Sequence, residues 1–132
     1  MVKLDHLAIP VSDWARSRDW YVGNLGFAVE FEVPGGGTWG RGVCAIQDDA
    51  GLTIFLDQAD PPIQSGQASY TLQVDSVDAL FRRLAARGVA FISPPARQFW
   101  GYGAVLADPD GHRLLLWDEA SMARNDTAQA AS

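Results

Sequence analysis

The chain has 132 residues, of which 48% are hydrophobic and 20% charged, the balance of one soluble globular domain at roughly 150 residues per domain. Ten Lys and Arg against sixteen Asp and Glu give a net charge of −6. This charge argues against nucleic acid as a partner, because such binding draws its affinity from basic residues. The single cysteine, Cys44, excludes an internal disulfide and a cysteine-based zinc site.

The sequence shows no sign of a membrane span or a secretion signal. No apolar run approaches the ~20 residues that a membrane-spanning helix needs, and residues 1–5 lead directly into a strand pattern. We therefore expect a cytoplasmic protein with no membrane partner. Five tryptophans in so short a chain raise the expectation of a binding surface, since a tryptophan N–H needs a partner when it is buried.

The two halves of the chain repeat the same elements in the same order. Each half reads as a strand, a helix and three further strands. Alternating apolar runs predict strands at 3–10, 27–33, 42–48, 52–57, 68–74, 89–93, 102–107 and 112–118. A first helix is predicted at about 13–23 with Ser12 or Asp13 as its cap, and a second from Ser76 to Gly88.

Four landmarks mark the repeat at nearly equal spacing. The matching pairs are Val11-Ser12-Asp13-Trp14 with Val74-Asp75-Ser76-Val77, Leu25-Gly26-Phe27 with Arg87-Gly88-Val89, Trp39-Gly40-Arg41-Gly42 with Trp100-Gly101-Tyr102-Gly103, and 51–57 with 111–117. The sequence thus predicts an α+β fold of two βαβββ modules, 3–58 and 67–118, with a linker at 59–66, in one domain that spans 1–118. The polar composition of residues 119–132 predicts a flexible C-terminal tail.

Strand parity sorts the side chains of each sheet onto two faces. One face is apolar and is expected to meet the helices: Leu7, Ile9, Ile54, Leu56, Tyr70, Leu72, Val74, Leu114 and Leu116. The other mixes polar, charged and aromatic groups, as a pocket lining does: Leu4, His6, Ala8, Thr53, Phe55, Asp57, Ser69, Thr71, Gln73, Arg113, Leu115 and Trp117. A solvated sheet face has a similar composition, so parity alone leaves both interpretations open.

Together with the repeat, three motifs resemble the vicinal oxygen chelate superfamily. They are the opening Leu4-Asp5-His6-Leu7-Ala8-Ile9, the helix exit Leu25-Gly26-Phe27 and the late turn Asp108-Pro109-Asp110-Gly111-His112. The superfamily includes glyoxalase I, extradiol dioxygenases, fosfomycin-resistance enzymes and bleomycin-resistance binding proteins. The resemblance covers about residues 3–118 and implies that the two modules form a cup, which in the family's enzymes surrounds a divalent metal.

The resemblance also indicates which positions would hold that metal. It places the four ligand positions on His6, Phe55, Ser69 and Leu115. Only His6 carries a competent ligand, and a divalent ion needs three or four converging donors. A shifted site that uses His6 and Asp57 would still lack a third donor. We therefore expect no metal and no cofactor.

Other signs of catalysis are weak. Gly35-Gly36-Gly37 lacks the lysine and the following helix of a phosphate loop, so it reads as a hairpin loop. Cys44 lies in an apolar strand and is expected to be a buried, unreactive thiol. His112 is expected in the turn or on the helix-facing side.

Because three of the four metal positions lack a metal ligand, the sequence resembles the bleomycin-resistance proteins within the superfamily. Those proteins are small acidic homodimers that sequester a cationic heteroaromatic antibiotic. The resemblance implies a metal-independent binding protein, a homodimer, for a small aromatic ligand that can carry positive charge. The predicted ligand-binding residues are His6, Trp39, Phe55, Asp57, Ser69, Trp100, Tyr102, Arg113, Leu115 and Trp117.

The same residues also allow purely structural interpretations and other functions. Trp14 and Trp20 read as helix packing residues, and Trp39 and Trp100 can simply cover the ends of sheets. A lyase or isomerase with a non-standard metal site, or with His6 as general base, and an interaction module with an empty cup are the other functions that the sequence leaves open.

Overall fold

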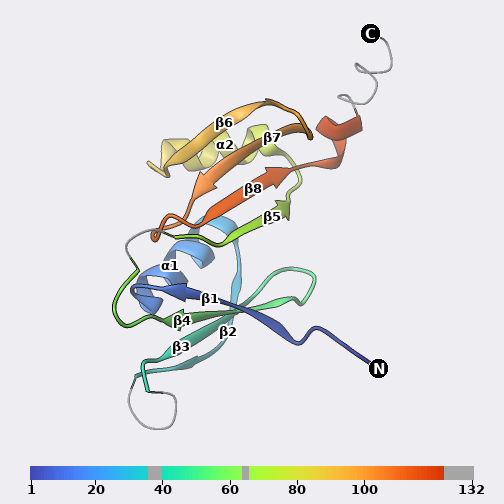
Figure 1. Cartoon of the computed structure of the whole chain (residues 1–132). Helices are drawn as coiled ribbons and strands as arrows, with labels where there is room; N and C mark the ends of the chain where they lie inside the picture. Colours follow the sequence, from blue (N-terminus) through green and yellow to red (C-terminus); the bar gives the residue numbers. More distant parts are fainter. Residues whose placement is uncertain (36–39, 64–65, 124–132) are drawn as a thin grey trace. The chain divides into compact units, whose positions relative to one another are not determined.

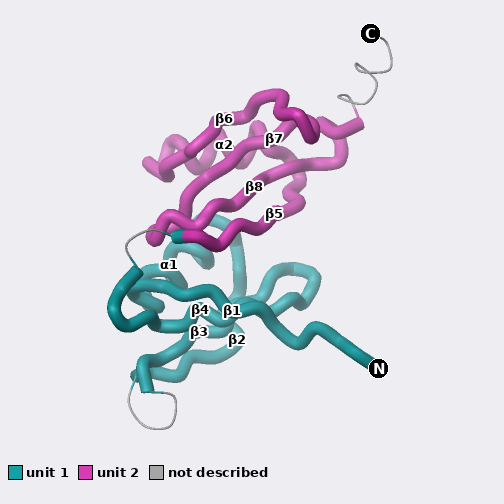
Figure 2. Tube along the Cα trace, viewed as in Figure 1, with its two compact units in different colours: residues 1–66 teal, residues 67–132 magenta. Residues whose placement is uncertain are grey.

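The computed structural model describes residues 1–35, 40–63 and 66–123. The chain divides into two compact units, residues 1–66 and 67–132, coloured teal and magenta in Figure 2. The boundary between them falls at the end of the predicted linker.

Each unit is a βαβββ module, as the sequence predicts (Figure 1). The elements of unit 1 are β1 (His6–Val11), α1 (Trp14–Leu25), β2 (Ala28–Val33), β3 (Val43–Gln47) and β4 (Thr53–Gln58). Those of unit 2 are β5 (Ser69–Gln73), α2 (Val77–Ala86), β6 (Phe91–Gln98), β7 (Gly101–Ala107) and β8 (Arg113–Trp117). The α+β fold class is confirmed.

The two sheets have the same strand order, and the strands that pair with β4 and β8 do so in the same register. Unit 1 forms a four-stranded sheet in the order β1-β4-β3-β2, and unit 2 forms one in the order β5-β8-β7-β6. The first strand of each unit runs parallel to the last, so that Ala8 lies beside Phe55 and Thr71 beside Leu115. The remaining pairs are antiparallel. The repeat seen in the sequence is therefore a repeat of the hydrogen-bonded frame.

Both helices begin at the caps that the sequence offers. The carboxylate of Asp13 accepts hydrogen bonds from the N–H groups of Ala15 and Arg16, both at 3.1 Å. The hydroxyl of Ser76 accepts one from the N–H of Ala79 at 3.1 Å. Of the two candidates for the first cap, Asp13 takes the role, while the Ser12 hydroxyl donates to the carbonyl of Ile63 at 3.0 Å.

The turn before the last strand is also the same in both units. One oxygen of Asp48 accepts from the N–H groups of Ala50 and Leu52 at 2.9 and 2.8 Å. One oxygen of Asp108 accepts from the N–H groups of Asp110 and His112, both at 2.9 Å. An aspartate in this position replaces backbone hydrogen bonds that the turn cannot make with itself. Both turns end on a glycine with positive φ, at 88° and 85° respectively.

The apolar face of each sheet packs on the helix of its own unit. The helix α1 contacts β2, β3 and β4, and α2 contacts β6 and β7. The fully buried side chains include Val11, Tyr21, Ile46, Leu56, Val77, Leu84, Leu106, Leu114 and Leu116. One residue of the predicted helix-facing set departs from this pattern. Leu7 is 44% exposed, because it lies on the edge strand β1 while α1 packs mainly on the other three strands.

Two segments differ from the prediction. The strand β6 covers Phe91–Gln98 rather than 89–93 and contains Pro94 and Pro95, which an edge strand tolerates because one side of it has no neighbour to bond. Residues 119–123 form a helical turn where the sequence predicts the start of a flexible tail. The rest of that predicted tail, 124–132, lies outside the described residues.

Candidate functional site

Unit 2 carries a hollow of about 490 Å³ on the face of its sheet that points away from α2. Three predicted ligand-binding residues line it: Trp100, Leu115 and Trp117. Thr71 and Met122 complete the lining. The volume falls within the range of small-molecule pockets, and a mostly apolar wall with one hydroxyl is the usual composition of such sites.

Strand alternation explains how these side chains meet. Thr71 and Leu115 are register partners on β5 and β8, and Trp117 follows Leu115 by two residues on the same face. Trp100 directly precedes β7, and its indole lies over Gly103 of that strand. A Cβ built on Gly103 would stand 2.3 Å from the Trp100 ring and 2.3 Å from the carbonyl oxygen of Leu116. The absence of a side chain at Gly103 therefore lets the Trp100 ring lie against the sheet.

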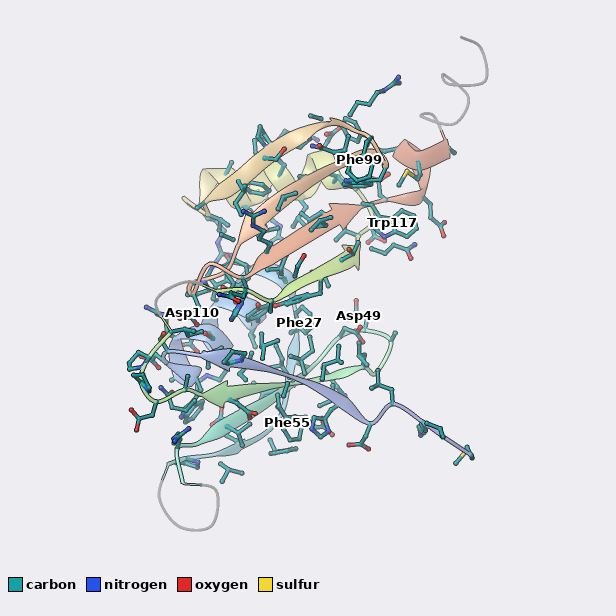
Figure 3. All side chains as sticks on the ribbon, viewed as in Figure 1. Phe27, Asp49, Phe55, Phe99, Asp110 and Trp117 are labelled. Atoms are coloured by element: carbon teal, nitrogen blue, oxygen red, sulfur yellow. The ribbon has the colours of Figure 1, made fainter. Side chains whose placement is uncertain are left out.

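The corresponding face of unit 1 is built from stacked rings. The imidazole of His6 on β1 stacks on Phe55 of β4, with ring centroids 3.8 Å apart and planes inclined by 12°. Phe31 of β2 lies nearly perpendicular to Phe55, with ring centroids 5.4 Å apart. Figure 3 marks Phe55 on this sheet and Trp117 on β8 of unit 2. Such a stack offers a flat surface on which an aromatic ligand can lie.

Acidic and amide groups border the stacked rings of unit 1. Asp57 lies two residues after Phe55 on the same face. Partial desolvation raises the pKa of Asp57 above its ordinary value of 3.8, while the neighbouring His6 acts in the opposite direction. At the other end of β4, the Thr53 hydroxyl donates to Glu30 at 2.8 Å and accepts from Gln47 at 3.3 Å. The unit 1 face is thus the polar and negatively charged counterpart of the apolar hollow.

The remaining predicted site residues lie elsewhere. Ser69 and Arg113 are register partners at the start of β5 and β8, on the face of the hollow but outside its lining. Tyr102 was predicted to face the ligand, but it lies on the opposite side of the sheet. Its hydroxyl donates to Asp78 of α2 at 2.5 Å, so the ring lies on the helix side. Parity accounts for this, because Tyr102 is one residue from Gly103, over which the Trp100 ring lies. Trp39 lies outside the described residues.

The donor atoms of the chain do not fit the metal site of the superfamily's enzymes. Of the four positions, Phe55 and Leu115 carry hydrocarbon and Ser69 an alcohol. The Nδ1 atom of His6 lies 2.9 Å from a carboxylate oxygen of the exposed Asp5. Among residues 1–35, 40–63 and 66–123, no group of three or more His, Cys, Asp or Glu side chains could hold a metal ion.

The other chemically notable side chains serve structure. Cys44 is fully buried, and burial, followed by the negative charge of Glu32, raises the pKa of its thiol to about 11, so it carries almost no reactive thiolate near neutral pH. His112 is fully buried, and its Nδ1 atom accepts a hydrogen bond from the N–H of Ala68 at 3.0 Å. Both placements confirm the sequence interpretation.

Sequence reasoning missed two residues of the hollow. Thr71 lies on the predicted pocket face and is the register partner of Leu115, so strand alternation could have predicted it as a lining residue. Met122 has no such signal, because it lies in a segment whose composition predicts a tail. In the part of the chain that the structure describes, no helix is long and apolar enough to cross a membrane.

The repeated βαβββ module and its strand order define a class of two-module α+β proteins. Residues 3–116 match the Glyoxalase/Bleomycin resistance protein/Dioxygenase superfamily, and the chain belongs to it. The resemblance inferred from the sequence is thereby confirmed.

Several proteins resemble this chain over most of its length. TnmS3, an antibiotic binding protein from Streptomyces sp. CB03234, is 30% identical with a TM-score of 0.73, covering 89% of this chain and 96% of its own. UcmS2 is 25% identical with a TM-score of 0.73, covering 88% and 97%. An uncharacterised protein of Shewanella frigidimarina (strain NCIMB 400) is 27% identical over 124 residues, covering 86% of this chain and 88% of its own.

Proposed function

We propose that this protein is a metal-independent binding protein that sequesters a small aromatic ligand, such as an antibiotic, without transforming it. The observation that carries the proposal is the hollow in unit 2, where Trp100, Leu115, Trp117 and Met122 surround a single hydroxyl. Leu115 occupies one of the positions at which the superfamily's enzymes hold their metal. An apolar side chain there favours a ligand held by stacking and burial.

The charge of the chain supports a preference for cationic ligands. The net charge is −6, and Asp57 stands beside the stacked rings of His6 and Phe55. An acidic surface raises the local concentration of a positively charged ligand and its association rate. A good aromatic contact contributes about 0.5–1.5 kcal/mol beyond the area that it buries.

The likeness to TnmS3 supports the same function. TnmS3 is described as an antibiotic binding protein and is 30% identical to this chain. We extend the ligand class, an antibiotic, to this protein and not a particular compound. The cytoplasmic location, the homodimer and the shared cup of the two modules remain predictions of the sequence.

A catalytic function has less support. The pairing of His6 with Asp5 supplies a carboxylate that could orient a general base, but the Asp5 side chain is 94% exposed, so it holds the imidazole only weakly. The imidazole also stacks on Phe55. The lyase or isomerase alternative therefore depends on a candidate base whose orientation is only weakly fixed.

Intrinsic tryptophan fluorescence tests the proposal directly. Purified protein is titrated with bleomycin-type antibiotics, with acridine orange as a planar aromatic cation, and with choline as a cation that has no rings. We expect quenching by aromatic members at micromolar concentrations and none by choline.

Matched variants assign that quenching to the hollow. Trp117→Ala should weaken binding about tenfold, the effect of removing a large stacking side chain. Trp20→Ala, which removes a tryptophan from α1, is the control and should leave the affinity unchanged. Equal affinity of wild type and Trp117→Ala, or no binding across the panel, would contradict the proposal.

A further inference from the structure

The short helical turn after β8 forms one wall of the hollow. Residues 119–123 are helical, and Met122 from this turn lines the hollow together with Trp100 and Trp117. The neighbouring Ser121 is buried. The turn is thus packed on unit 2 and contributes to its binding face.

Asp118 holds this turn in place. Asp118 is a buried residue, only 3% exposed. One carboxylate oxygen accepts from the N–H of Ser121 at 2.6 Å, and the other accepts from the N–H of Val77, the first residue of α2, at 2.7 Å. The backbone carbonyl of Asp118 also accepts from the N–H of Met122 at 3.2 Å. A single buried carboxylate therefore joins the start of α2 to the turn that carries Met122.

The equivalent residue in unit 1, Gln58, bonds to the start of its helix but to no helical turn in the described residues after its last strand. Gln58 is the last residue of β4 and corresponds in register to Asp118, which directly follows β8. Its side-chain oxygen accepts from the N–H of Trp14, the first residue of α1, at 3.0 Å. Beyond Gln58 the chain leads into the segment between the units, and residues 59–63 form no helical turn. The wall that Met122 provides has no counterpart among the described residues of unit 1.

We propose that Met122 is a ligand-contacting residue and that Asp118 is the residue that positions it, so that the C-terminal turn sets the width of the hollow. This inference rests on the proposed binding function of the hollow. A thioether side chain is flexible and polarisable, and it contacts aromatic rings favourably at their edges. Met122 therefore suits a wall that must adapt to flat ligands of different outline.

The methionine content of the chain provides a direct test. The protein has two methionines, Met1 and Met122, so protein labelled with ¹³C at the methionine methyl groups gives two NMR signals. Met1 is fully exposed and serves as an internal control. On titration with acridine orange, the Met122 signal should move in step with the quenching of tryptophan fluorescence, and the Met1 signal should stay in place.

Variants separate the two roles. Met122→Ala should lower the affinity for acridine orange about tenfold, since it removes most of the apolar area of that wall. Asp118→Ala should shift the Met122 signal toward that of Met1 in the ligand-free protein and weaken binding by a similar factor. Gln58→Ala is the matched control, because it removes the corresponding side-chain acceptor at the start of α1 in unit 1 and should leave both readouts unchanged.

The outcomes are distinguishable. Quenching that is accompanied by no movement of the Met122 signal, or wild-type affinity in Met122→Ala, overturns the role of the turn and leaves the binding function standing. Absence of both quenching and movement contradicts the binding function and the role of Met122 together. If Asp118→Ala fails to fold, Met122→Ala and the wild-type titration still decide the contact.

Discussion

The two units share one backbone frame and differ in the side chains on its face. Strand order, the register of the strands that pair with β4 and β8, the presence of a side-chain cap at each helix start and the aspartate turn are shared by both. On the face, His6 corresponds to Ser69, Phe55 to Leu115 and Asp57 to Trp117. The frame is thus retained where hydrogen bonds require it, while the exposed face has diverged into an acidic, ring-stacked surface and an apolar hollow.

The largest expected effect concerns the glycine beneath Trp100. Gly103→Ala places a methyl group 2.3 Å from both the Trp100 ring and the carbonyl oxygen of Leu116, so we expect destabilisation of about 3 kcal/mol, at the upper end for overpacking. Binding of acridine orange should also be lost, because the indole must leave its position. Urea denaturation and fluorescence titration measure the two effects.

Gly42 in unit 1 provides a control on the helix-facing side of the other sheet, since by strand register it corresponds to Tyr102. A Cβ there would lie 2.9 Å from the indole nitrogen of Trp14, and the residue has a φ of 102°, which disfavours alanine. Gly42→Ala should therefore lower stability without changing the affinity for acridine orange. Loss of binding in both variants would show that unfolding, and not the position of Trp100, is responsible.

The aspartate turns provide the next comparison. Asp108→Ala leaves two buried N–H groups without their acceptor and should cost about 2–3 kcal/mol of unfolding free energy. Asp48→Ala, at the more exposed turn of unit 1, should cost about 1 kcal/mol because water can replace the lost acceptor. Thermal or urea denaturation of the two variants checks the order, and a larger loss in Asp48→Ala would contradict it.

The helix caps should behave alike in the two units. Asp13→Ala and Ser76→Ala each remove one capping side chain, and each should lower the unfolding free energy by about 1 kcal/mol. Equal losses in urea denaturation would sharpen the view that the frame is repeated. A much larger loss in one variant would show that its helix has a further role in stability.

The smallest expected effect is the pH dependence that arises from Asp57. Because the pKa of Asp57 is raised in the folded protein, chiefly by desolvation, the folded state holds this proton more tightly, and stability falls as pH rises through the interval between the unfolded and folded values. Asp57→Asn removes this contribution. The variant should gain stability relative to wild type above that interval and lose the gain below pH 3.8.

The same titration bears on binding. If a cationic group of the ligand pairs with Asp57, the affinity for acridine orange should rise as Asp57 ionises, and Asp57→Asn should abolish that rise. Affinity that is independent of pH in wild type would argue against a charge pair between the ligand and Asp57.

Much of the fold followed from the sequence because its determinants are local. Caps such as Ser76, turn residues such as Asp108 and strand alternation act over a few residues, and the repeat confirmed each of them twice. The extent of β6 did not follow, because Pro94 and Pro95 are acceptable only on an edge strand, and strand order is a property of the whole sheet.

The sequence predicted those residues of the candidate site whose positions follow from strand alternation. It missed those whose positions depend on tertiary packing. Leu115 and Trp117 share a face by parity, and Trp100 was indicated by the repeated Trp-Gly step. Tyr102 was assigned to the wrong side because its neighbour Gly103, and not Tyr102, faces the hollow. Met122 depends on a long-range bond from Asp118 to α2, which the composition of the tail does not reveal.

Native mass spectrometry of protein purified without chelator, before and after addition of acridine orange, tests the central claim most directly. We expect the mass of the polypeptide alone, as a homodimer, followed by one bound dye per chain with no divalent ion. A stoichiometric divalent ion in the purified protein, or no dye retained at micromolar concentrations, would contradict the account.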